Sequence, residues 1–413
     1  MFRVSLSGAF YFYSVFRHVV SDRKKPYNID VNASPGSIRF DRNELAGAFG
    51  DIGTDLPLVV GMILASGLHS ASVLVMFGVM QYFTAVRYRM PIPVQPLKAV
   101  AVIVITQKIA PGVLYGGGLA IGIAMLLLTV TGGITWLARV VPKSVVRGLQ
   151  LGLGIQLATL ALRDYVRADG ARGYVLAAIG FLIIITLLGN RRIPAAIPVI
   201  VLGVVYAFVY NLSGADFANA AGITLPRFHA PAMSDITAGF LLLALPQIPL
   251  SLGNSILATR QVAEDLFPER DISVKKLSYT YAAMNLVSPF FGGVPTCHGS
   301  GGLVGHYTFG ARTGGSIIIY GTIFLVLGIF FASGFQQVVH IFPLPVLGVL
   351  LFFEAVALIL MIRDETASRD SMFIVIMVGL IAAGIPYGYA IALVIGTALH
   401  YARRSLPYSN ESR

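Results

Sequence analysis

The sequence predicts an all-α polytopic membrane protein, and three features of the chain indicate this fold class. Of its 413 residues, 56% are hydrophobic and 12% are charged, whereas soluble globular domains carry about 25% charged residues. Apolar segments of about 20 residues, the length that crosses a bilayer, recur from near residue 45 to residue 402. Two shorter apolar runs occupy corresponding places in the two halves of the chain. We therefore expect fourteen transmembrane elements arranged as 7+7 inverted repeats, with two half-helices preceded by short extended segments.

Apolar runs bounded by Gly, Pro or charged residues set the limits of the expected helices. The segments between these runs are too short for a separate soluble domain. In chain order the helices are expected at 45–65, 71–88, 96–107, 114–138, 143–162, 173–188 and 195–212, then at 237–259, 274–289, 299–309, 316–333, 345–361, 371–384 and 387–402.

The distribution of basic residues predicts the orientation. If the N-terminus is cytoplasmic, 24 of the 30 Lys and Arg residues fall on the cytoplasmic side and five on the other. The positive-inside rule then predicts cytoplasmic tails at 1–42 and 403–413 around one membrane unit at 43–402. We expect the first tail to be interfacial or disordered. The net charge of +11 reflects this orientation, so no nucleic acid is expected as a partner.

Two of the expected helices are too short to cross the membrane. The run 96–107 spans about 18 Å, against a hydrocarbon core of about 30 Å, and the run 299–309 is shorter still. The broken segments MPIPVQP (90–96) and SPFFGGVPTCHG (288–299) precede them. Because each short run is third in a set of seven, we expect broken helices that meet near the midplane, as in secondary transporters.

The N-termini of these two short helices form the expected binding site. Unpaired backbone N–H groups and the helix dipole attract anions there. The side chains at the two ends are mainly hydrogen-bond donors, and the glycines let a ligand approach the backbone closely. A ligand rich in acceptors fits such a site, so we expect a tetrahedral oxyanion. Two alternatives stay open: the Gly-rich ends serve only tight packing, or the lysine snorkels to an interface. The candidate residues are Gln95, Lys98, His298, Gly299, Ser300, Gly301 and Gly302.

Asp51 and Asp55 lie four residues apart and share a face of the first helix. Two ionised carboxylates would repel a dianion, so we expect at least one to be protonated in the loaded state, which would couple transport to protons. The alternative is that Asp51 only accepts hydrogen bonds from the backbone or from Lys98.

Other polar groups in apolar helices have more than one interpretation. Gln247 and Asn254 are candidate donors to the substrate or hydrogen bonds between helices. Glu354 is expected to have a structural partner, and His306 to pack or to cap its half-helix. The single Cys297 excludes an intrachain disulfide and a Cys-based zinc site, so neither a metal nor a cofactor is expected.

Four motifs resemble the MOT-type molybdate transporters, a branch of the sulfate permease superfamily without a STAS domain. They are NELAGAFGDIGTDLPLVVGMI (43–63), IPVQPLKAVA (92–101), LPQIPLSLGNSI (245–256) and CHGSGGLVGHYTFGARTGG (297–315). The resemblance covers about residues 43–402 and implies a uracil-permease-like fold with a core domain and a gate domain. The family motifs fall on Asp51, Thr54, Gln95, Lys98, Gln247, His298, Gly299, Gly301 and Gly302.

The resemblance further implies a core at 43–138 and 237–333, a gate at 139–236 and 334–402, alternating access to molybdate, and a homodimer within the lipid membrane. Asp55 and His306 depart from the pattern of plant relatives, which have an aromatic or apolar residue and Gln there.

Several alternatives to a molybdate carrier stay open from the sequence. Sulfate shares the charge and shape of molybdate, so a sulfate or general oxyanion permease is the nearest one. An anion channel and a nucleobase permease share the suspected fold. An intramembrane serine protease would use Ser300, but His298 stands where such enzymes have glycine, and neither H-E-x-x-H nor G-x-S-x-G occurs. We therefore expect no enzyme.

Overall fold

The computed structural model describes residues 37–188, 190, 193–210, 222–335 and 342–405. Most of the expected N-terminal tail and the last residues of the expected C-terminal tail lie outside the described residues. Each range expected to be helical contains a helix. In the first half these are α2 (Arg42–Gly47), α3 (Ile52–Ser66), α4 (Ser70–Tyr88), α5 (Lys98–Gln107), α6 (Pro111–Val130), α7 (Gly133–Val140), α8 (Lys143–Leu160) with η1 (Ala161–Tyr165), α9 (Gly170–Leu187) and α10 (Ala196–Tyr210), with strand β1 (Val94–Pro96) before α5.

The second half of the chain also contains a short strand followed by a short helix. It contains α12 (Met233–Gly239), η2 (Phe240–Ala244), α13 (Leu245–Leu250), η3 (Ser251–Leu257), α14 (Ala258–Leu266), α15 (Val274–Val287), η4 (Ser288–Phe291), strand β2 (Thr296–His298), α16 (Ser300–Thr308), α17 (Gly315–Phe330), α19 (Leu344–Leu360) with η5 (Met361–Glu365), α20 (Arg369–Gly384) and α21 (Gly388–Ser405).

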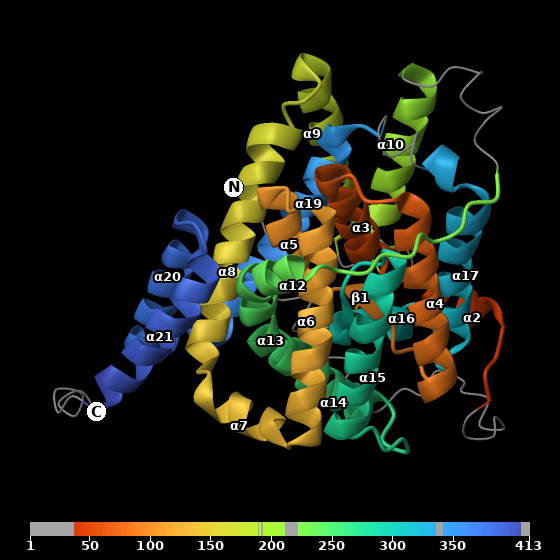
Figure 1. Ribbon diagram of the computed structural model, residues 1–413. Coiled ribbons are helices and arrows are strands. Elements are labelled where there is room, and N and C mark those ends of the chain that lie inside the picture. The colour runs from red at the N-terminus through yellow and green to blue at the C-terminus, as the bar shows by residue number, and fades with distance from the viewer. Residues whose placement is uncertain (1–36, 189, 191–192, 211–221, 336–341, 406–413) are drawn as a thin grey trace.

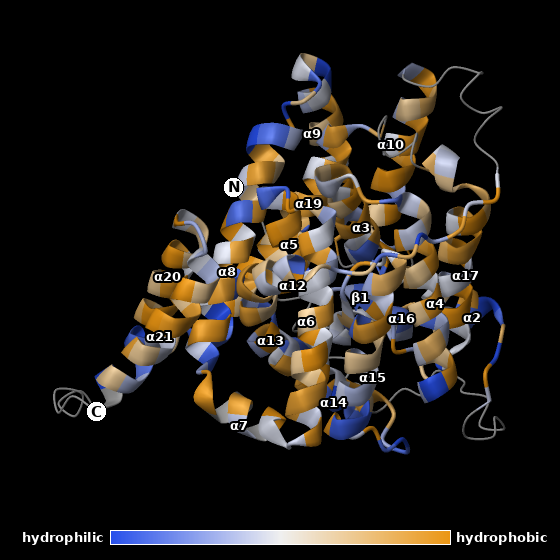
Figure 2. Ribbon diagram, in the orientation of Figure 1, coloured by the Kyte–Doolittle hydropathy of each residue, from blue (hydrophilic) through white to orange (hydrophobic). Residues whose placement is uncertain are grey.

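Several helices present apolar side chains to their surroundings. Figure 2 shows hydrophobic residues along the outer helices, and the outward face of α9 includes exposed Val175, Leu182 and Ile185. Water would penalise such a surface, whereas lipid does not. The described helical segments that are long and apolar enough to cross a membrane are Ser70–Tyr88, Pro111–Val130, Lys143–Tyr165, Gly170–Leu187, Met233–Leu266 and Leu344–Glu365.

The first expected helix is interrupted, unlike the continuous helix predicted at 45–65. Residues between α2 and α3 form turns, and Asp51 is the N-cap of α3. The backbone of Gly50 lies so close to the backbone of Gly305 in α16 that a β-carbon at Gly50 would collide with it. The interruption therefore coincides with tight packing between the two halves of the chain.

The eighth expected helix is longer than predicted and contains irregular turns. It runs without a break from Met233 to Leu266 through the π-helical segments η2 and η3, which flank α13. Pro249 lies inside α13 and removes a backbone donor. π-helical turns therefore lie on both sides of the segment that contains this proline, and such turns are frequent at functional sites.

Helices of the first half pack directly against helices of the second half. The pairs include α4 with α17, α6 with α15, α8 with α20, and α9 with α19. Figure 1 shows the blue C-terminal helices α20 and α21 beside the yellow α8. The two halves of the chain are therefore intertwined and do not form separate lobes.

Buried Glu44 anchors α2 to the start of α17. One carboxylate oxygen accepts the backbone N–H groups of Arg312 (2.9 Å) and Thr313 (2.8 Å), and the other accepts that of Ser316 (2.9 Å). Burial raises the pKa of Glu44, an effect that these hydrogen bonds partly offset.

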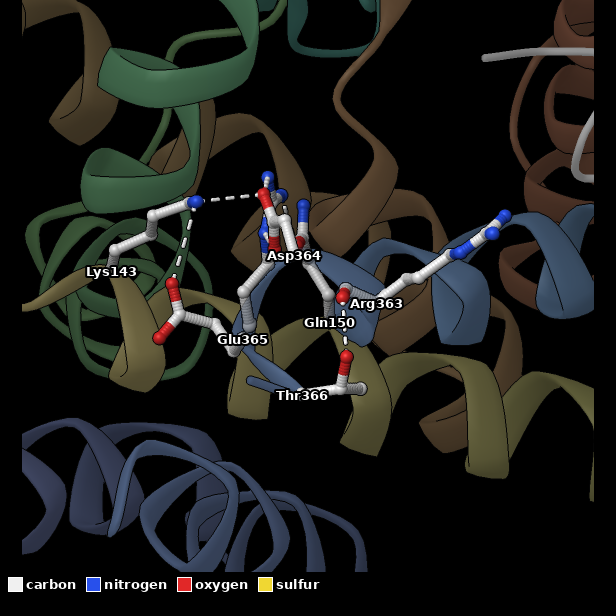
Figure 3. A network of polar contacts seen from close by, with 7 residues as sticks. Lys143, Gln150, Arg363, Asp364, Glu365 and Thr366 are labelled. Carbon is white, nitrogen blue, oxygen red and sulfur yellow. Dashed lines mark hydrogen bonds and ion pairs between the residues drawn. The ribbon is translucent and has the colours of Figure 1, made fainter. Parts of the chain in front are cut away.

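A network of ion pairs fastens the start of α8 to the end of α19 (Figure 3). Asp364 accepts Lys143 at 2.8 Å and Arg147 at 2.6 Å, and Lys143 also lies 3.4 Å from Glu365. The side chains of Lys143 and Asp364 are 57% and 40% exposed, so water weakens these interactions.

Candidate functional site

The two extended segments predicted before the half-helices pair with each other. Strands β1 and β2 are antiparallel, and Gln95 lies opposite Cys297. The N-cap residue of each half-helix extends the pairing: Leu97 N–H donates to Pro295 (3.0 Å) and Gly299 N–H donates to Pro93 (3.2 Å). This pairing satisfies backbone groups that lie among buried residues. Figure 1 shows α5 and α16 on either side of β1.

An amide side chain completes the outer edge of each strand. Gln81 of α4 donates to the carbonyl of Val94 (2.7 Å) and accepts its N–H (2.8 Å). Asn285 of α15 does the same for Thr296, at 2.7 and 3.0 Å. Neither residue was predicted from the sequence. The signal that could have identified them is an amide inside the apolar run of the second expected helix of each half.

Asp51 and Gln95 form a buried pair against the first turn of α16. Gln95 Nε2 donates to both carboxylate oxygens of Asp51, at 2.8 and 2.7 Å. A side chain on Gly299 would overlap Gln95, and one on Gly302 would overlap Asp51. Two glycines of the HGSGG motif are therefore needed because this pair lies directly on the helix.

The first turn of α16 is open on its other face. Gly301 is exposed, and a β-carbon there would meet no atom within 4 Å. The Ser300 hydroxyl, beside it, donates to the carbonyl of Asn254 at 3.1 Å. Asn254 belongs to η3 and follows the exposed Gly253. Ser300, Gly301 and Asn254 therefore border accessible space at a helix N-terminus.

Lys98 is the first residue of α5 and pairs with Glu354 of α19. The Nζ–Oε1 distance is 2.6 Å, and the two side chains are 35% and 9% exposed. Glu354 thus has a polar partner that the sequence analysis did not identify. Lys98 is held at the start of its half-helix and keeps enough exposure to meet a solute.

Asp55 lies one helical turn from Asp51 and is fully buried. Its Oδ2 accepts the Tyr320 hydroxyl at 3.1 Å, while its Oδ1 has no hydrogen-bond partner among the described residues. The His306 ring lies edge-on to Tyr320, with 5.7 Å between ring centroids. Thr54, on the same helix, is half-buried.

Gln247 and His298 are buried and make hydrogen bonds within the protein. Gln247 Oε1 accepts the Val100 N–H in the first turn of α5 at 3.2 Å, and its Nε2 donates to Ser251 at 2.9 Å. The His298 ring lies 2.7 Å from the Thr280 hydroxyl. These side chains hold the half-helices in place from the protein interior.

No group of three or more His, Cys, Asp or Glu residues that could hold a metal ion occurs within the described ranges. Cys297 is buried and lies opposite Gln95 in the strand pair. What the site does offer is one lysine, exposed backbone at a helix N-terminus, and buried carboxyl groups behind it.

The sequence is similar to known transporters over most of its length. Residues 43–157 and 239–358 match the family described as "Molybdate transporter of MFS superfamily". Molybdate transporter 2 of Arabidopsis thaliana is 33% identical over 383 residues, covering 81% of this chain and 82% of that protein. Molybdate transporter 1 of the same plant is 32% identical over 403 residues, covering 86% of this chain and 87% of the relative.

Solved structures of anion transporters have the same fold. The transmembrane domain of the cyanobacterial bicarbonate transporter BicA aligns with a TM-score of 0.61 at 17% identity, covering 86% of this chain and 96% of that chain. Murine Slc26a9 in its inward-facing state aligns with a TM-score of 0.64 at 13% identity, covering 98% of this chain and 73% of the other. Although the family description names the MFS superfamily, the fold is that of the BicA and SLC26 transporters.

These similarities confirm the resemblance noted in the sequence and the expectation that the chain is not an enzyme, since the matched relatives are transporters. The protein is an integral, multi-pass membrane transporter. The family match covers more than half of the residues, and the two plant relatives exceed 30% identity. The chain therefore belongs to the MOT1-type family of molybdate transporters.

Proposed function

We propose that this protein is a secondary active molybdate transporter that works by alternating access, with the oxyanion bound at the N-termini of α5 and α16. The observation that carries the proposal is the antiparallel pairing of β1 and β2, from which the two half-helices start in opposite directions. Helix N-termini attract anions through unpaired N–H groups and the helix dipole. The names of the plant relatives support molybdate as the oxyanion.

In this proposal the substrate is held by Lys98, by Ser300 and by first-turn N–H groups of both half-helices other than that of Val100, which donates to Gln247. Gly301 and Asn254 line the approach. The exposure of Gly301 and the partial exposure of Lys98 support this placement. Gln95, Gln247, His298, Gly299 and Gly302 position these elements, since their side chains or their tight packing serve neighbouring protein groups.

We also propose the 7+7 inverted repeat with both termini cytoplasmic. The two strands carry matching clamps, Gln81 on the second helix of the first half and Asn285 on the second helix of the other. The pairing of α4 with α17 is matched by that of α6 with α15, as two opposed repeats require. The proposed core comprises 43–138 and 237–333, the proposed gate 139–236 and 334–402, and their relative movement would expose the site alternately.

Proton coupling is proposed at Asp51 and Asp55. Both carboxyl groups are buried, they lie one turn apart, and Asp51 contacts the first turn of α16 through Gly302. A dianion arriving at that turn favours the neutral form of a nearby carboxyl group. Protons would therefore enter together with the oxyanion.

The test is uptake of radiolabelled molybdate into proteoliposomes, with or without an inward proton gradient and with excess sulfate as competitor. Uptake that needs the gradient and resists sulfate supports the proposal. Equal inhibition by sulfate would indicate a general oxyanion permease, and a rate far above carrier turnover would indicate a channel.

The site is tested by two lysine variants of the same helix. Lys98→Gln should abolish saturable uptake, whereas Lys108→Gln, at the C-cap of α5 and exposed, should leave it unchanged. Equal uptake by the two variants would contradict the proposed site. Absence of uptake by folded wild-type protein would contradict the proposed function.

A further inference from the structure

The ion pair between Lys98 and Glu354 joins a half-helix of the proposed core to a helix of the proposed gate. We propose that Glu354 takes the place of the substrate in the empty transporter. Its carboxylate neutralises Lys98 there, and the arriving oxyanion displaces the carboxylate. This inference rests on the proposed function. Glu354 would act in the step in which the empty transporter turns its site back to the other side of the membrane.

Glu354 lies in an environment that does not favour a lone charge. It is the only charged residue of α19, whose sequence is LPVLGVLLFFEAVALIL, and its side chain is 9% exposed. A buried carboxylate without a partner costs several kcal/mol in general. Lys98, 2.6 Å away, supplies the compensating charge. In the absence of an anion, the pair therefore compensates the buried charge of Glu354 and neutralises partly exposed Lys98.

Lys98 lies near several acidic groups. Its ammonium pairs with Glu354 at 2.6 Å, and Asp51 and Asp55 belong to α3, which packs against α5. A bound dianion adds two negative charges to this single lysine. Like charges repel in a low-dielectric site, so the arriving oxyanion and Glu354 compete for Lys98. Glu354 is the competitor that can withdraw, because it belongs to the gate, whereas both aspartates belong to the core.

The other ion pairs of the segment formed by α19 and η5 join elements of the proposed gate to each other. Asp364 and Glu365, in η5 at the end of α19, pair with Lys143 and Arg147 of α8 (Figure 3). Both helices belong to the proposed gate, so movement of core against gate leaves those pairs intact. The pair of Lys98 with Glu354 instead spans the two moving parts.

This role predicts different effects on net uptake and on exchange. In net uptake the empty carrier must return, with Lys98 neutralised by Glu354. In exchange between labelled and unlabelled molybdate, the carrier is loaded in both directions and Lys98 is neutralised by substrate. Glu354→Gln should therefore lower net uptake at least about threefold, because partly exposed Lys98 loses the counter-charge that lies 2.6 Å from it, while exchange persists.

The same substitution removes the group that competes with the oxyanion. The KM for exchange in Glu354→Gln should therefore fall, by roughly threefold or more. A merely structural role would instead reduce net uptake and exchange together. Glu365→Gln is the matched control, because it makes the same chemical change and removes a lysine partner on the same helical segment. It should alter neither activity.

The experiment measures both activities in proteoliposomes made from wild type, Glu354→Gln and Glu365→Gln, with unlabelled molybdate preloaded for exchange. Selective loss of net uptake with a lower KM supports the proposal. Unchanged net uptake, or a parallel loss of net uptake and exchange in folded Glu354→Gln, overturns it. Wild-type protein inactive in both assays would instead contradict the proposed function itself.

Glu354→Asp provides a second variant if Glu354→Gln does not fold. Aspartate keeps the charge but is one methylene shorter, so its pairing with Lys98 should weaken without disappearing. The ratio of net uptake to exchange should then fall below that of wild type. A wild-type ratio in Glu354→Asp overturns the proposal.

Discussion

Replacing Gly302 by alanine should destabilise the protein, although the neighbouring Gly301 should tolerate the same change. A β-carbon at Gly302 would overlap the Asp51 carboxyl group and lie 2.6 Å from the Pro93 side chain. Atoms at such distances must move apart. The Asp51 side chain would have to shift, and its two hydrogen bonds from Gln95, now 2.8 and 2.7 Å, would lengthen or break.

The expected magnitude follows from three contributions. Overpacking a filled site costs about 1–3 kcal/mol. Loss of the hydrogen bonds to a buried carboxyl group costs about 1.5–3 kcal/mol. The higher helix propensity of alanine returns about 1 kcal/mol. Gly302→Ala should therefore lower the free energy of unfolding by about 2–4 kcal/mol, taking the two costs as partly overlapping.

Thermal unfolding in detergent, followed by loss of monodisperse protein, measures this effect. Gly301→Ala is the matched control, because its β-carbon would enter open space on the same helical turn. The control should unfold at or above the wild-type temperature. If Gly302→Ala unfolded at the same temperature as Gly301→Ala, the close packing of Asp51 on α16 would be refuted.

Four other substitutions test the contacts described above. Gln81→Ala and Asn285→Ala should each lower the free energy of unfolding by about 1–3 kcal/mol, because they leave buried backbone groups of the strands without partners. Gln107→Ala, at an exposed glutamine, is the control. Unfolding of the two variants at the temperature of the control would contradict the role of Gln81 and Asn285. Burial raises the pKa of Glu44, so the contribution of Glu44 to stability declines as pH rises from about 4.5 through the raised pKa. Glu44→Gln should remove this decline from unfolding curves recorded across that pH range. The same decline in Glu44→Gln and in wild type would contradict the prediction. Asp364→Asn should lower stability by about 1 kcal/mol at low salt and by less at high salt, because Asp364 and Lys143 are exposed even though Arg147 is only 17% exposed; a loss of several kcal/mol would contradict this.

The positions of the helices could be predicted because each depends on a local run of side chains. Apolar length and flanking Gly or Pro are properties of about 20 consecutive residues. The two half-helices at Lys98–Gln107 and Ser300–Thr308 were predicted for the same reason, from short runs that follow broken segments. The interruption near Gly50 was not predicted, and it lies where the chain packs on the backbone of Gly305, a contact remote in sequence.

The pairing of polar groups could not be predicted, because each partner is remote in sequence. Lys98 and Glu354 are 256 positions apart, and Gln95 and Asp51 are 44 apart. Hydropathy identifies such residues as unusual in a membrane helix but carries no information on which of them meet. Lys98, Gln95 and Asp51 could therefore be identified as candidates, but the hydrogen bonds and ion pair that join them to their partners could not.

The sequence by itself determined that this is a multi-pass membrane protein of the molybdate transporter family, and where its long and short helices lie. Those conclusions depend on the length of local apolar runs and on short motifs, which can be read without knowledge of the fold. Only the tertiary structure decided that β1 pairs with β2, that Asp51 packs against α16, and that Glu354 forms an ion pair with Lys98. These contacts arise when helices from both halves pack together, because a buried polar group must then find its partner on whichever helix lies beside it.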